Sequence, residues 1–301
     1  MKAVYDDGFV YFLARYNDAR LDTDREPWYV NPATDSWKQE SRYPQFDETG
    51  KLILQGFYED KFSLMWEASP VEGFAQSGCA VSCHVGLSPF ENDKGKTALK
   101  YTNNFDEVLD MWHLKFVHSA GTSIPTIDDQ HTNWTSTASN GGRHSDPGVN
   151  SYANNKQTLD GKTVPLYALK SPSAPYFWIT PEQRTTGEAL QVITAHDNGD
   201  LSLSDGTRIS ASDPDFQRGG DFQPPSVYIR IPDGDRADIV AKAVYGSGFW
   251  TVEIKRALTT GSNVDVQFDD LSKDHPFGVA VFDNAAIAHA TSSESVFLRF
   301  K

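Results

Sequence analysis

The chain has 301 residues, and its 41 acidic and 27 basic side chains give a formal net charge of −14 at pH 7 and a pI of about 4.9. An acidic surface of this kind repels phosphate backbones, so we expect no nucleic acid as a partner. No run of about 18 apolar residues is present, and we therefore expect no membrane span in this chain.

The first segment, residues 3–16, contains two β-rich runs on either side of Asp6-Asp7-Gly8 and predicts a hairpin. The residues before it lack the apolar stretch of a signal peptide. Because a strand begins almost at residue 1, we expect that a signal or another segment upstream has been removed. Residues 61–66 alternate in polarity and predict a strand that runs toward the two cysteines.

The two cysteines lie in Cys79-Ala80-Val81-Ser82-Cys83, and His84 follows directly. Two thiols with an adjacent imidazole suit the covalent capture of haem, because each sulfur can add to one vinyl group and the histidine can ligate the iron. The usual spacing is Cys-x-x-Cys-His, and this chain has one residue more. Positions i and i+4 still share a face in a helical turn, so the geometry tolerates the insertion.

Three other roles for the cysteines remain open from the sequence. A disulfide between residues four apart would close a very small loop and add little stability. A zinc site would need a fourth ligand, and no second close pair of cysteines or histidines is present. The two thiols could also be reduced and unpaired, since free cysteine often packs as a small apolar side chain.

Residues 101–116 read as a turn that leads into an apolar strand, although 104–110 is also compatible with a short helix. Met111 and His113 occupy alternate positions of this strand, so they should point to one face, and both could ligate iron. Residues 118–165 show little periodicity and include three further histidines. We expect a long loop there that could cover a pocket.

From residue 174 onward the pattern is almost wholly β. The predicted strands are 175–179, 189–195, 200–203, 226–231, 237–244, 249–255, 263–267, 278–283 and 295–300. This spacing predicts an antiparallel β-sandwich or barrel with long loop insertions and few short helices, such as 210–218. Without a repeat or a low-complexity linker, we expect one domain over residues 1–301.

His289 lies between the last two predicted strands, among small residues that would let a flat macrocycle approach the backbone. It is a second candidate iron ligand. The turns at 197–200 and 233–235 resemble pieces of calcium loops, but neither continues into the full ligand spacing. Hairpin turns are favoured at both places, which leaves calcium as a weakly supported cofactor.

Five segments in this order resemble the ethylbenzene-dehydrogenase-related haem-binding domain, over nearly the whole chain. They are the N-terminal hairpin, the cysteine loop, and residues 110–115, 248–258 and 276–284. That family includes the haem subunits of type II dimethyl sulfoxide reductase-like enzymes and cytochromes with covalent haem. The resemblance implies a β-sandwich related to family-nine carbohydrate-binding modules, which grips one haem between loops at an end of its sheets.

The resemblance also implies a set of ligands. In the haem b members the axial ligands are a methionine near the place of this cysteine loop and a lysine before the last strand. Carried over, these places are His84 and His289, which ranks His289 ahead of His113 and Met111 as the distal ligand. The family's Trp-x-Trp-Lys pattern reads Trp112-His113-Leu114-Lys115 here, so Trp112 joins the expected cofactor-binding residues, although part of the packing on the ring is expected to differ.

Together these features predict an electron-transfer cytochrome, more a carrier than an enzyme, with one covalent haem c. We expect it in the periplasm or outside the cell, with a redox partner that presents a basic docking patch. A haem subunit of a larger oxidoreductase is an alternative, and so is an enzyme with a vacant iron face. A non-redox carbohydrate- or calcium-binding sandwich is another, with Trp28, Trp134 or Trp178 as sugar platforms.

Overall fold

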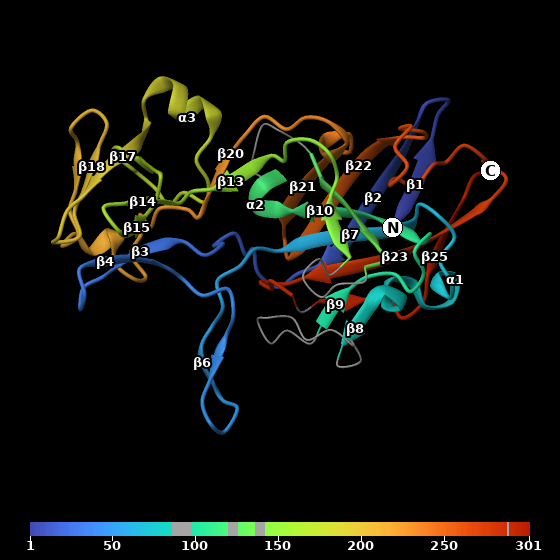
Figure 1. Ribbon diagram of the computed structural model, residues 1–301, viewed down its shortest axis with the longest axis horizontal. Helices are drawn as coiled ribbons and strands as arrows, with labels where there is room; N and C mark the ends of the chain where they lie inside the picture. Colours follow the sequence, from blue (N-terminus) through green and yellow to red (C-terminus); the bar gives the residue numbers. More distant parts are fainter. Residues whose placement is uncertain (86–97, 120–125, 136–141, 288) are drawn as a thin grey trace.

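The computed structural model describes residues 1–85, 98–119, 126–135, 142–287 and 289–301 (Figure 1). Strands make up 43% and helices 9% of the structure, and the paired strands of its sheets run antiparallel. The expected fold class, mainly β and antiparallel, is therefore confirmed.

Two sheets form the larger lobe. The four-stranded sheet has the order β1-β2-β22-β21, and the larger sheet has the order β12-β11-β10-β7-β23-β24, with β25 also paired to β23. Their bounds are β1 Lys2–Tyr5, β2 Phe9–Asn17, β21 Val240–Gly246, β22 Phe249–Ala257, β7 Lys61–Glu67, β10 Val108–Lys115, β11 Asp128–Asn133, β12 Arg143–Ser145, β23 Asp274–Phe282, β24 Ala290–Thr291 and β25 Val296–Arg299. The predicted N-terminal hairpin is confirmed as β1 and β2.

One buried cluster joins the inner faces of these two sheets, so they pack face to face. Large aromatic side chains fill it: Trp66 and Trp112 lie 5.1 Å apart between ring centroids, and Trp250 of the four-stranded sheet stacks on Phe116 at 3.9 Å. Because side chains alternate along a strand, this packing decides which residues of β7 and β10 face outward.

A second buried cluster forms a smaller lobe, seen at the left of Figure 1. Its strands are β3 Trp28–Asn31, β4 Ser36–Gln39, β14 Gln157–Leu159, β15 Lys162–Val164, β16 Tyr167–Leu169, β17 Ala189–Ala195, β18 Leu201–Leu203 and β19 Arg208–Ile209. Trp28 is only 1% exposed there, and its Nε1 donates to the carbonyl oxygen of Asn155 at 2.8 Å. It is therefore not an exposed platform for a sugar, contrary to that expectation.

The remaining short elements connect or flank the lobes. They are β5 Gln45–Phe46, β6 Leu52–Leu54, β13 Tyr152–Asn154, β20 Val227–Ile229, α2 Phe116–Ser119, α3 Pro181–Thr186, and the 3₁₀ turns η2 Pro214–Phe216 and η3 Asp235–Ala237. The segments that build the smaller lobe are the insertions of the predicted single domain, and that domain assignment stays a prediction.

Several predicted elements differ in the structure. Residues 175–179 and 263–267 form no strand, and residues 104–110 form a turn and the start of β10 instead of a helix. In 263–267 the chain is held by side chains, because Asp265 is ion-paired and Val266 packs into the core. Within 210–218 only the three-residue turn η2 is helical.

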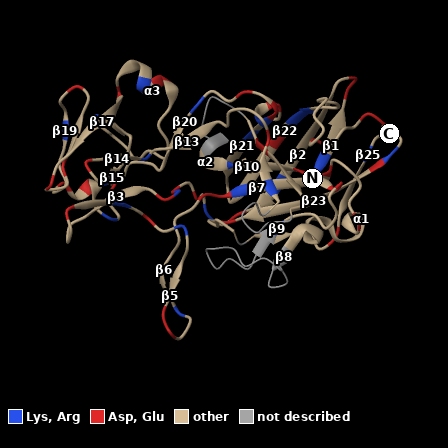
Figure 2. Ribbon diagram, viewed as in Figure 1, with Lys and Arg blue, Asp and Glu red and all other residues tan. Residues whose placement is uncertain are grey.

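The charge is distributed over both lobes, with acidic segments along each of them (Figure 2). In the part of the chain that the structure describes, no helix has the length and apolar character needed to cross a bilayer.

Candidate functional site

The outer face of the larger sheet collects most of the predicted site residues. Met111 belongs to a small buried cluster on this face, whereas its neighbour Trp112 fills the core between the sheets. His113 shares the outer face with Met111, which confirms the expected alternation. Trp112 donates from Nε1 to Asp110 Oδ2 at 2.9 Å in the core, so the structure does not bring it to the outer face.

The cysteine loop covers this face with three short elements: α1 Phe74–Ser77, the 3₁₀ helix η1 Gly78–Ser82, and β8 Cys83–Val85, which pairs with β9 Ala98–Lys100. Gly78 has a φ of 55°, a left-handed conformation that favours glycine and lets the chain turn from α1 into η1. Cys79 therefore lies in η1, whereas Cys83 is extended and begins β8, so the two cysteines do not share one helical turn as the spacing predicted.

Both cysteines are free thiols, so the structure contains no disulfide between them. Cys79 is buried beside Met65 and Met111, and its Sγ lies 3.1 Å from Thr291 Oγ1. Cys83 is half-buried, and its Sγ accepts a hydrogen bond from Lys100 Nζ at 3.1 Å. The two sulfurs therefore contact different neighbours, Thr291 for Cys79 and Lys100 for Cys83.

Strand β23 approaches the cysteine loop at Gly278. A Cβ atom on this residue would lie 3.0 Å from the backbone nitrogen of Cys79 and 3.2 Å from its Cβ. The absence of a side chain at Gly278 therefore allows η1 to pack directly on the sheet.

Replacing Gly278 with valine is expected to push the cysteine loop away from β23 and to cost about 1–3 kcal/mol of folding free energy, because the site is already closely packed. Urea unfolding measures this cost. The matched control is Gly246→Val on β21, where a Cβ would meet nothing within 4 Å. Equal losses in the two variants would contradict the close approach at Gly278.

His113 is 5% exposed, and the Gln130 side chain lies within reach of its ring, although neither ring nitrogen makes a hydrogen bond of good geometry. Burial, followed by the nearby charge of Lys115, lowers its pKa well below the usual value, so the ring is neutral at pH 7. Its ring lies 5.8 Å from that of Phe282 on β23. A buried neutral imidazole with two unsatisfied nitrogens is energetically unfavourable unless another group meets it.

His289 lies on the other side of the site, in the connection between β23 and β24. Its ring is 4.5 Å from Phe282, so this one phenyl ring contacts both histidines. Nδ1 of His289 lies 2.7 Å from the carbonyl oxygen of Ile287, which makes Nδ1 the protonated nitrogen and leaves the lone pair on Nε2. Burial also lowers the pKa of His289.

Lys61 begins β7 at the same place and is only 2% exposed. Its Nζ donates to the carbonyl oxygen of Ala286 at 3.0 Å and lies 4.0 Å from the centroid of the Phe282 ring. Burial lowers the pKa of Lys61 to about 7, against the opposing charge of Glu59. The site therefore holds a buried lysine that loses its proton far more readily than an exposed lysine does.

The lowered pKa of Lys61 predicts a pH-dependent stability. Between pH 7 and the ordinary lysine pKa near 10.5, the unfolded chain binds more protons than the folded chain, so this residue makes folding more favourable as the pH rises. The free energy of unfolding of wild type minus that of Lys61→Met should therefore increase from pH 7 to pH 9, by at most about 1.4 kcal/mol per pH unit. Urea unfolding at both pH values measures it. Parallel pH profiles would contradict the shift, and the exposed Lys273→Met serves as the control.

The third residue of the predicted motif is only partly described. The backbone of His84 is part of β8 and pairs with Leu99, but its side chain lies outside the described part of the structure. Its role as proximal ligand therefore stays a prediction.

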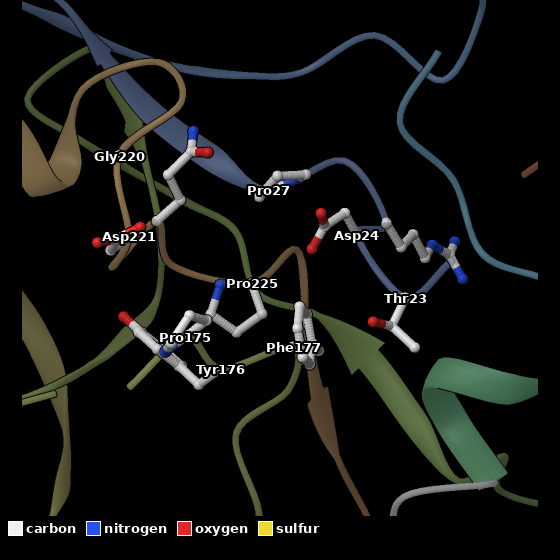
Figure 3. Close-up of a pocket in the computed structure, with 11 residues that line it drawn as sticks. Thr23, Asp24, Pro27, Pro175, Tyr176, Phe177, Gly220, Asp221 and Pro225 are labelled. Atoms are coloured by element: carbon white, nitrogen blue, oxygen red, sulfur yellow. The ribbon is translucent and has the colours of Figure 1, made fainter. Parts of the chain in front are cut away.

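A cavity of about 270 Å³ lies elsewhere, lined by the segment before β3 and by loops around residues 175–177 and 220–225 (Figure 3). Tyr176 and Phe177 line it together with Asp24, Asp221 and three prolines. It contains none of the predicted site residues, so it is separate from the cysteine site.

Sequence reasoning does not single out Lys61, Lys100 or Phe282. A lysine at the start of a strand carries no local signal of burial. Only the pairing of β7 with β23, which sets Phe282 opposite Lys61, and that of β8 with β9, which sets Lys100 opposite Cys83, bring these residues together.

Two comparisons with known proteins bear on this arrangement. A family model described as ethylbenzene dehydrogenase matches residues 1–293, almost the whole chain. No curated protein sequence matches the chain.

Proposed function

The chain belongs to the ethylbenzene dehydrogenase family, and from this premise we propose that it is an electron-transfer cytochrome with one haem c held on the outer face of its larger sheet. The observation that carries the proposal is the pair of free thiols, one in η1 and one at the start of β8, directly before His84 and beside the half-buried imidazole of His289, whose Nε2 keeps its lone pair.

The residues present fit a haem. Cys79 and Cys83 would anchor it through thioethers, and His84 would ligate the iron on one side. On the other side we propose His289, because its Nδ1–H is already oriented by Ile287 and Nε2 remains available. Met111 and Phe282 supply apolar surface on the same face.

Bound haem supplies one-electron redox chemistry. The surrounding residues would bind and orient it and exclude water, and Lys61 and Lys100 lie close enough to His289 to affect its protonation. Positive charge at this place favours the reduced iron, whose net charge is one unit lower, and so raises the reduction potential. With two imidazole ligands the site would carry electrons and leave no position for a substrate.

Partner and location follow from the same proposal. The net charge of −14 would steer the chain toward a redox partner with a basic docking patch. Covalent haem attachment would place the mature protein in the periplasm or outside the cell. The family match also supports a second candidate function, in which this chain is the haem subunit of a larger oxidoreductase and passes electrons to or from a partner subunit.

The pyridine haemochrome spectrum tests the proposal. The chain, expressed with a cytochrome maturation system and a signal peptide, should give the absorption bands of an iron porphyrin with saturated vinyl groups. A purified, folded chain without these bands would overturn the proposal. Copurification of a second subunit from the native source would favour the oxidoreductase subunit over the free carrier.

Substitution of the two histidines separates the distal ligands. His289→Ala should convert a low-spin haem to a form that binds carbon monoxide readily when reduced, because one iron position becomes vacant. His113→Ala should keep the low-spin spectrum. Absorption spectra with and without carbon monoxide measure both. The reverse pattern would assign the distal position to His113, and Met111→Leu provides the matched test of the third candidate.

A further inference from the structure

A group of carboxylates inside the larger lobe has more negative charge than the positively charged side chains next to it can balance. One oxygen each of Asp129, Asp238 and Asp265 lies within 4.8 Å of the other two. Asp129 comes from β11, Asp238 from the segment before β21, and Asp265 from the loop before β23. Three separate segments of the chain therefore meet at this point.

The carboxylates are buried but not satisfied. Asp129 is 0% exposed and Asp265 is 1% exposed, yet Asp129 Oδ2 and Asp265 Oδ1 have no hydrogen-bond partner. Asp238 Oδ1 is also buried without a donor, although the residue as a whole is half-buried. Asp129 and Asp238 can hydrogen-bond to each other only when one of them carries a proton, and Asp265 Oδ1 has no partner in either case. Buried carboxylates that are ionised need a positive group, so this cluster has a place for a cation.

The positively charged side chain beside them, Arg256, already pairs with one oxygen of Asp265. Arg256 is fully buried and its Nη2 lies 3.2 Å from Asp265 Oδ2, the other oxygen of that carboxylate. Thr260 donates to the same Oδ2 at 2.7 Å. Asp110 adds a further buried negative charge, and its Oδ1 is likewise unpartnered.

We propose that Asp129, Asp238 and Asp265 bind one calcium ion that joins β11 to the segments before β21 and β23. An all-carboxylate set suits a hard cation, and Ca²⁺ accepts the irregular geometry that three separate segments provide more readily than Mg²⁺ does. The half-buried Asp238 gives the ion access from solvent. The site is distinct from the cysteine face, because Asp129 lies opposite Trp112 on the inner face of the sheet.

A second acidic group in the chain provides the contrast. Asp18, Asp60 and Asp283 also bring three oxygens together, but none of these residues has a buried oxygen without a partner. Asp60 instead accepts from the backbone nitrogens of Asp22 and Asn284 and from Trp250 Nε1. Proximity of carboxylates alone therefore does not distinguish the two groups; the unsatisfied oxygens do.

The test is calcium binding by the full chain after treatment with EGTA and gel filtration. Isothermal titration calorimetry with CaCl₂ should give one site per chain, thermal unfolding should move to higher temperature with added Ca²⁺, and MgCl₂ should do neither at equal concentration. Asp238→Asn should weaken calcium binding at least tenfold. The exposed Asp283→Asn from the second acidic group should leave it unchanged.

The wild-type titration decides the proposal even if a variant fails to fold. Absence of calcium binding by the wild-type chain would overturn it, and so would an Asp238→Asn variant with wild-type affinity. An equal loss in Asp238→Asn and Asp283→Asn would also overturn it, because binding would then reflect general surface charge. None of these readouts depends on haem, so the result is independent of the function proposed above.

Discussion

Replacing both Cys79 and Cys83 with serine is expected to abolish covalent haem attachment while the two packed sheets stay folded. Both thiols are free, and serine is small enough to take the place of Cys79 against Gly278. Haem staining after denaturing electrophoresis measures attachment, and circular dichroism reports the β structure. The double variant should lose the haem signal completely, whereas each single variant should keep one thioether and part of the signal.

The control for this experiment is Ala80→Ser, an exposed position in the same turn, which should leave the haem signal at the wild-type level. A double variant that still retains haem through denaturation would contradict attachment at these sulfurs. Loss of the signal in Ala80→Ser would show that the turn itself, and not the thiols, had been disturbed.

Replacing Arg256 with methionine is expected to destabilise the chain by about 3–5 kcal/mol, because removal of one partner leaves a buried charge uncompensated. The guanidinium is fully buried, is paired with Asp265, and lies 5.7 Å from the Trp112 ring. Burial raises the pKa of Asp110 to about 7, and the positive charge of Arg256 limits this rise. Urea unfolding in calcium-free buffer measures the loss without a contribution from metal binding.

Arg299→Met is the matched control, since Arg299 pairs with Asp274 on the surface, where both side chains are largely exposed. Exposed ion pairs contribute about 0–1 kcal/mol, so this variant should be close to wild type. Similar losses in the two variants would contradict the structural role of the buried pair. A gain in stability for Arg256→Met would show that the acidic residues around it are largely protonated.

Several strands of both lobes could be predicted from local patterns. The hairpin around Asp6-Asp7-Gly8 carries its own turn signal, and 189–195 and 249–255 alternate clearly enough to give β17 and most of β22. The shared face of Met111 and His113 follows from the period of a strand and needs no tertiary information. The family resemblance is shown over residues 1–293 by the matching family model.

The elements that could not be predicted are those that form because of contacts with distant parts of the chain and not because of a local sequence pattern. Strand β11 reads Asp-Asp-Gln-His-Thr-Asn and resembles a loop, but it pairs with β10 along its length, and its buried Asp128 forms an ion pair with Lys115 and accepts a hydrogen bond from Gln130. Helix α3 is short, and its sequence signal is limited to a capping box of Thr180 and Gln183 with Pro181 as the first helical residue.

The functional residues divide in the same way. The Cys79, Cys83 and His84 motif can be read from spacing alone, whereas Lys61 and the carboxylates of Asp129, Asp238 and Asp265 come together only through sheet register and loop packing. The two faces of the larger sheet consequently serve different purposes in this account. The outer face presents thiols, imidazoles and Phe282, while the inner face combines an aromatic core with a buried acidic group.

The mass of the intact wild-type chain under denaturing conditions, after expression with a cytochrome maturation system, is the most direct measurement of the central proposal. We predict a single species heavier than the polypeptide by one haem, because thioether bonds at Cys79 and Cys83 survive unfolding. A species with the mass of the bare polypeptide would contradict covalent haem binding, and with it the assignment of this chain as a c-type electron carrier.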